Sequence, residues 1–146
     1  MKRFAALGLA LVTMAAAGAC GGADSSSDIV APSGTVVTDT FTGTVPLPVN
    51  GVPQADVHNF TVTVAGNISI TLVSAGPPPT ITMGLAVGNP SSTGTCSLLS
   101  GGTTATSAGT TAQLSGSAAA GAYCVAVIDL GNALQPITYT VTVAHT

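Results

Sequence analysis

The segment NFTVTVAGNISITL, residues 59–72, alternates apolar and polar side chains with a period of two. This alternation places every second side chain on the same face of a β-strand, whereas a helix would need apolar residues three and four positions apart. Most of the apolar positions are β-branched, which suits a pleated, half-buried surface. The segment therefore predicts two strands with one buried face each, and Ala65-Gly66 between them predicts a tight hairpin.

The same period-two pattern recurs on both sides of this segment. The predicted inward-facing residues are Phe41 in a weaker first strand, then Ile81, Met83, Leu85 and Val87, then Tyr123, Val125 and Val127, and finally Ile137, Tyr139, Val141 and Val143. Proline clusters at 46–48 and 77–79 predict loops, and no helix of useful length is expected. Roughly seven short strands of this kind predict an all-β fold, an antiparallel β-sandwich. Residues 34–146 suffice for one core and one domain.

The beginning of the chain is typical of a bacterial export signal. Lys2 and Arg3 precede an apolar run, residues 4–17, that is too short to span a bilayer as a helix. The run ends in Ala17-Gly18-Ala19-Cys20, for which two interpretations are open. An ordinary signal peptidase could cut after the small residues and leave Cys20 as a free thiol. Alternatively, these residues resemble the lipobox of bacterial lipoproteins, although Ala17 stands where that family usually carries leucine.

The cysteine count favours the lipobox. Of three cysteines, Cys96 and Cys124 can pair with each other, which leaves Cys20 for lipidation. An exported protein should oxidise Cys96 and Cys124 to a disulfide. We therefore expect a signal peptide over 1–19, a lipidated cysteine with a flexible tether over 20–33, and the folded domain over 34–146. The stretch 88–116 is rich in serine, threonine and glycine, and its sequence leaves open whether it is ordered.

Localisation follows from the same residues. By resemblance to lipoprotein sorting rules, a glycine rather than an aspartate after Cys20 implies the outer membrane of the bacterial cell envelope, where the organism has one. Without lipidation the protein would be secreted. Several acyl chains on one cysteine would anchor the protein firmly, because a single chain binds a membrane only reversibly.

The composition excludes several classes of function. Lys2 and Arg3 are the only basic residues besides histidine, and both would leave with the signal. Without cationic side chains the mature chain has no electrostatic basis for binding nucleic acid. It also lacks the lysine that a P-loop or a Schiff base needs. We expect no cofactor. The acidic residues of the chain are five aspartates, Asp24, Asp28, Asp39, Asp56 and Asp129.

Asp56 and His58 are the candidate site residues. They are two positions apart on a predicted strand, so they should face the same side. Such a pair could bind a metal or exchange protons with a substrate, or it could be a polar end of the strand at the rim of the sandwich. A metal would need a third ligand, for which His145 is the candidate. The chain has no Gly-x-Ser-x-Gly motif, and its acids are scattered, so no catalytic residues are assigned and no enzyme is expected.

Three segments resemble the pre-peptidase C-terminal domain family. Residues 55–72 are similar to the opening strands of that domain, AGAYCVAV at 120–127 to its second hallmark, and YTVTV at 139–143 to its closing strand. The resemblance covers residues 36–144. It implies a β-sandwich of jelly-roll type that is not itself catalytic. Some members bind calcium or extracellular polymers through clustered acids and aromatics, a pattern that this chain lacks.

These observations together predict a non-catalytic, lipid-anchored cell-envelope protein with an accessory binding, adhesion or structural role. Its partner would be an envelope protein or polymer of unknown identity. One alternative is a self-assembling surface coat or filament subunit, because no lysine guards the edges of the predicted strands. A second alternative is a hydrolase or metal-binding protein centred on Asp56 and His58.

Overall fold

The computed structural model describes residues 34–146. The expected signal peptide, the lipidated Cys20 and the tether lie outside the described residues. The described part contains eight strands and no helix, and thus no helix that could cross a membrane. The strands are β1 (Val37–Val45), β2 (Ala55–Val62), β3 (Gly66–Gly76), β4 (Thr82–Pro90), β5 (Cys96–Ser107), β6 (Leu114–Ala118), β7 (Gly121–Ile128) and β8 (Ile137–His145).

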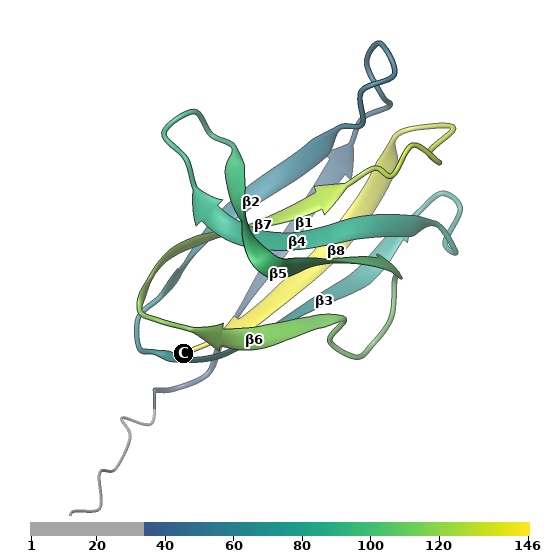
Figure 1. Ribbon diagram of the computed structural model, residues 1–146. Helices are drawn as coiled ribbons and strands as arrows, with labels where there is room; N and C mark the ends of the chain where they lie inside the picture. Colours follow the sequence, from purple (N-terminus) through teal and green to yellow (C-terminus); the bar gives the residue numbers. More distant parts are fainter. Residues whose placement is uncertain (1–33) are drawn as a thin grey trace, which may run out of the picture. The chain divides into compact units, whose positions relative to one another are not determined.

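The strands form two antiparallel four-stranded sheets that pack face to face (Figure 1). The first sheet has the order β1-β8-β3-β6, and the second has the order β2-β7-β4-β5. The pairs β1·β8, β2·β7, β3·β6 and β4·β5 show a long hairpin wrapped around the sandwich, which is the jelly-roll arrangement. The predicted β-sandwich of jelly-roll type is therefore confirmed.

The connection between β2 and β3 differs from the prediction. The two strands lie in different sheets, so Ala65-Gly66 does not close a hairpin, and that prediction was wrong. The backbone N–H groups of Thr63 and Val64 instead donate to the carbonyl oxygen of Thr146, at 3.0 and 3.3 Å. Alternating side chains mark the buried face of a strand, but they do not reveal which sheet the strand joins. Turn residues between two such strands therefore suit a connection to the opposite sheet as well as a hairpin within one sheet.

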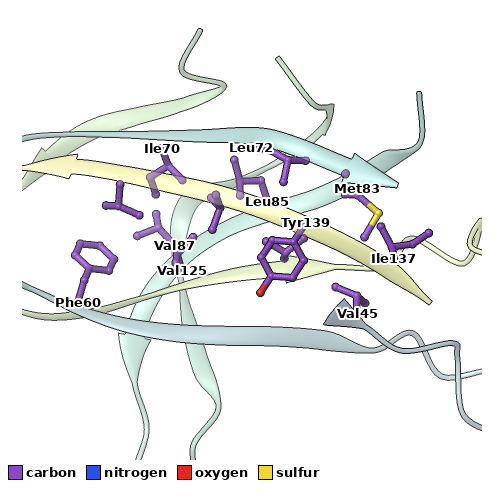
Figure 2. Packing of buried hydrophobic residues seen from close by; sticks show 14 of the residues in the cluster. Val45, Phe60, Ile70, Leu72, Met83, Leu85, Val87, Val125, Ile137 and Tyr139 are labelled. Atoms are coloured by element: carbon purple, nitrogen blue, oxygen red, sulfur yellow. The ribbon is translucent and has the colours of Figure 1, made fainter. Parts of the chain in front are cut away.

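The hydrophobic core lies between the two inner sheet faces (Figure 2). Its side chains come from both sheets and point toward one another. At most 1 % of the surface remains exposed for Ile70, Leu72, Met83, Leu85, Val125, Val127, Ile137, Val141 and Val143. All nine belong to the faces that the alternation predicted as inward. Aliphatic burial of this kind stabilises a fold by roughly 1.5–3 kcal/mol per side chain.

The serine- and glycine-rich stretch is ordered. It contains β5 and the beginning of β6, and β5 pairs along β4 from Pro90↔Cys96 onward. The predicted disulfide between Cys96 and Cys124 is present and joins the first residue of β5 to β7. Near β6, the backbone N–H of Leu72 donates to Oε1 of Gln113 at 2.7 Å, which fixes the end of the stretch against β3.

Replacing both cysteines, Cys96→Ala with Cys124→Ala, should lower the free energy of unfolding by roughly 3–4 kcal/mol, because a long loop of the unfolded chain is no longer closed. Urea denaturation of the oxidised wild type and the double variant measures the difference. Reductant should weaken the wild type to a similar extent and leave the double variant unchanged. Equal stabilities without reductant would contradict a stabilising role for the disulfide.

Candidate functional site

The inward-facing polar side chains gather along one open edge of the sandwich. There the edge strand β1 of the first sheet faces the edge strand β2 of the second. The aromatic ring of Phe41 in β1 stacks on the imidazole of His58 in β2, with 4.8 Å between ring centroids and 12° between ring planes. This contact bridges the two sheets at an edge that no further strand of residues 34–146 covers.

Asp56, His58 and Tyr139 form the main cluster at this edge. The Tyr139 hydroxyl lies 2.8 Å from Oδ2 of Asp56 and 2.8 Å from Nε2 of His58. Asp56 Oδ2 and His58 Nε2 are 3.8 Å apart. The prediction that Asp56 and His58 face the same side is therefore confirmed. Tyr139, which the alternation had placed only in the core, is the residue that links them.

The direction of the hydrogen bonds follows from the tyrosine. Its hydroxyl donates to the Asp56 carboxylate, so the hydroxyl oxygen accepts the Nε2–H of His58. Burial raises the pKa of Tyr139 well above its usual value, and the hydrogen bond and negative charge of Asp56 raise it further. Tyr139 therefore stays neutral and remains a donor over the whole physiological pH range.

Gly43 makes room for this cluster. It lies on the inward side of β1, and a Cβ atom at this position would collide with Oδ2 of Asp56 and the hydroxyl of Tyr139. Glycine is needed here because of this close approach. No motif singled out Gly43, because the sequence does not show which residues of β2 and β8 face it.

His145 is engaged elsewhere. Its Nε2 lies 3.0 Å from Oδ2 of Asp39, and its ring packs on Phe60 with 5.4 Å between centroids. The residue suggested as a third metal ligand thus forms a second, separate pair with a β1 carboxylate. Within residues 34–146 there is no group of three histidine, cysteine or acidic side chains that could hold a metal ion.

The two histidine clusters close the edge of the sandwich. Asp39 and Asp56 point inward from the edge strands β1 and β2, and inward-pointing charged groups discourage an edge strand from pairing with another chain. Across residues 34–146, neither imidazole is hydrogen-bonded to a serine, threonine or cysteine side chain. The two clusters form a polar border in which each histidine is bound through Nε2, while Nδ1 of His145 is buried without a hydrogen-bond partner among residues 34–146.

Asp129 has a third structural role. Its side chain is fully buried, and Oδ1 accepts hydrogen bonds from the backbone N–H groups of Gly131, Asn132 and Ala133 at 3.0, 3.3 and 3.3 Å. The carboxylate thereby fixes the loop between β7 and β8. The only sequence signal for this role is the preference of aspartate for turns.

Comparison with protein-family models gives no match for this chain, and comparison with curated proteins gives none either. The resemblance to pre-peptidase C-terminal domains therefore stays a prediction that rests on the strand motifs.

Gly43→Ala should lower the free energy of unfolding by about 1–3 kcal/mol, because the new methyl group forces Asp56 and Tyr139 apart. The matched control is Gly116→Ala in β6, where an added Cβ meets no atom within 4 Å. That control should change stability by less than about 0.5 kcal/mol. Urea denaturation measures both variants, and equal losses would show that the cluster does not depend on Gly43.

Tyr139→Phe should change how stability depends on alkaline pH. In the unfolded chain tyrosine ionises near its usual pKa of about 10, whereas folding raises the pKa of Tyr139. The stabilisation by Tyr139 is therefore complete below pH 10 and is lost as the pH rises above it.

At neutral pH the phenylalanine variant should be about 1–2 kcal/mol less stable than wild type, and this difference should shrink above pH 10. Urea denaturation between pH 7 and about pH 11 tests this. Tyr123→Phe, which retains Tyr139, is the control. A difference between wild type and Tyr139→Phe that does not depend on pH would contradict the expectation.

Proposed function

We propose that this protein is a non-catalytic, lipid-anchored module of the bacterial cell envelope with an accessory binding, adhesion or structural role. One observation carries this proposal. The aspartates and histidines of residues 34–146 all have structural partners: Asp39 with His145, Asp56 with His58 through Tyr139, and Asp129 with its own loop. Each of these five side chains is thus held by at least one hydrogen bond within the fold.

The hydrogen bonds of His58 and His145 argue against a role for their Nε2 atoms in acid–base catalysis. A general base needs a free position within hydrogen-bond reach of a substrate proton. Nε2 of His58 is occupied by Tyr139, and Nε2 of His145, which is 4 % exposed, is occupied by Asp39. The hydrolase alternative would therefore have to use Nδ1 of His58 as its base, and within residues 34–146 no group of three ligands supports the metal-binding alternative.

The disulfide supports an exported protein. Disulfides persist in oxidising compartments such as the periplasm and the cell surface, and they are rare in the cytosol. Cys96 and Cys124 form such a bond, which leaves Cys20 for acylation. This pairing agrees with the lipobox interpretation of residues 17–20.

The position of Gly34 suits a tether at one end of the domain. Gly34 lies beside Val64 in the β2–β3 connection and Thr146 at the C-terminus. The loops that join β1 to β2 and β7 to β8 project from the opposite end (Figure 1). An anchor attached before Gly34 would leave these loops free to meet a partner.

The partner would be an uncharged surface or polymer, or an envelope protein. Residues 34–146 contain no lysine or arginine, and their charged groups point into the sandwich or its loops. Ion pairing with a partner therefore contributes little. The inward-pointing Asp39 and Asp56 work against strand pairing between copies at the β1 and β2 edges. The edge strands β5 and β6 contain no charged residue, so the self-assembling alternative would have to use these two edges.

Intact mass spectrometry of the native protein extracted from membranes tests the anchor. The expected mass is that of the chain from Cys20 with acyl groups added and two hydrogens removed for the disulfide. A Cys20→Ser variant should lose both the acyl mass and the membrane association. The discovery of an unmodified chain in the culture medium would overturn the lipid anchor and indicate a secreted module.

A further inference from the structure

Exposed apolar side chains are concentrated at one end of the sandwich. Ten large apolar side chains of the described domain are exposed, and five of them lie in only two loops. We call these five residues the apolar tip: Leu47, Val49 and Val52 between β1 and β2, and Leu130 and Leu134 between β7 and β8. Their exposed fractions run from 39 % for Leu47 to 94 % for Leu134. Exposed apolar side chains that gather at one end of a folded domain, rather than being scattered singly, indicate an interaction site.

The first loop is an ordered apolar hairpin. Val49 and Val52 pair through two backbone hydrogen bonds, of 3.1 and 2.9 Å. Asn50 and Gly51 between them have φ values of 53° and 77°, the left-handed conformation that type I′ turns require. Figure 1 shows this hairpin projecting beyond the end of the sheets. Its valines are thus held in solvent by a defined backbone.

The second loop is fixed to the first. The buried carboxylate of Asp129 binds three successive backbone N–H groups of the β7–β8 loop. The backbone N–H of Asp129 donates to the carbonyl oxygen of Gln54 at 2.9 Å, which joins the loop to the base of the hairpin. The amide of Asn132 donates to Thr82 O at 3.0 Å, which joins the loop to β4. The two loops therefore present their apolar side chains as one unit.

The chemistry of the tip favours a lipid occupant. None of its five side chains is charged, and residues 34–146 contain no lysine or arginine that could attract an anionic headgroup or an acidic protein. The apolar groups stand on two separate loops. Projecting apolar groups suit a fluid hydrocarbon layer, which moulds itself around them, better than a rigid surface that would have to match them.

The length of the N-terminal segment permits this contact. In the proposed lipid-anchored form, residues 20–33 would reach at most about 50 Å when extended. The nine residues of β8 span about 30 Å along the sandwich. A domain held at Gly34 can therefore turn so that its far end touches the same bilayer in which Cys20 is anchored.

We propose that the apolar tip inserts into the interfacial hydrocarbon of a lipid bilayer, without a requirement for anionic lipid. Insertion orients the domain end-on to the membrane and removes the five side chains from water. The insertion itself does not require the acyl chains, so it goes beyond the proposed function and can be tested on the unlipidated domain. A mass without acyl groups would refute the lipid anchor but not the insertion of the apolar tip. An apolar tip that does not bind vesicles would refute the insertion but not the lipid anchor.

A tryptophan at the tip gives a direct test. The chain contains no tryptophan, so Leu134→Trp provides a single reporter. The domain of residues 34–146 contains all eight strands and the disulfide, and it can be prepared without the lipidated cysteine. With phosphatidylcholine vesicles, the emission should shift to the blue and be quenched by brominated acyl chains. Because no ion pairs are involved, high salt should not weaken binding, and anionic lipid should not strengthen it.

Two variants serve as matched controls. Val37→Trp places the reporter at a 47 % exposed site near Gly34, at the other end of the sandwich, and its emission should not change. Val49→Ser with Val52→Ser, in the Leu134→Trp background, should weaken vesicle binding at least tenfold. Both valines are exposed, so the melting temperature should stay near that of the parent, which separates lost binding from lost folding.

Three results would overturn the proposal. The first is an unchanged Leu134→Trp emission with phosphatidylcholine vesicles. The second is vesicle binding by the double serine variant at the affinity of its parent. The third is a blue shift that appears without vesicles and grows with protein concentration, because this would identify a second copy of the chain as the occupant of the tip.

Discussion

The packing of the two inner sheet faces against each other is the interaction on which the whole domain depends. β8 lies between β1 and β3, and its inward residues Ile137, Val141 and Val143 are completely buried against the second sheet. The charged groups of residues 34–146 contribute few ion pairs, so apolar burial has to supply most of the stability. Strand order, edge positions and loop positions then follow from how the chain wraps around this core.

The polar border at β1 and β2 is a consequence of the same packing. A sandwich leaves open edges, and the inward positions of its edge strands lie between core and water. At these positions β1 has Asp39 and β2 has Asp56 and His58, each bound to a partner from β8. A buried polar group costs free energy unless it is hydrogen-bonded, so Tyr139 and His145 complete the border. The Asp56–His58 pair, which the sequence analysis singled out as a candidate site, thus lies at the border between the core and solvent.

The sequence predicts the central strands well because these strands bury a full face. The alternation in β3, β4, β7 and β8 identified the core residues correctly, and cysteine counting identified the disulfide. β5 and β6 were not predicted, since edge strands bury few side chains and leave a weak pattern. The partners of Asp56 and His58 were also missed. Tyr139 is 81 residues from His58 along the chain, and only the register of strands in opposite sheets brings them together.

The burial of the Asp129 carboxylate is unfavourable, and the packing of the core does not require it. Its carboxylate is fully buried, and while Oδ1 binds the loop backbone, Oδ2 has no hydrogen-bond partner. An uncompensated buried oxygen of this kind costs free energy that a solvent-exposed turn would avoid. The loop it holds exposes Leu130 and Leu134, which is a second unfavourable arrangement in water. Local rules of folding are broken most often where a site serves something outside the domain. Both departures fall in a loop of the apolar tip, the surface that we propose inserts into a bilayer.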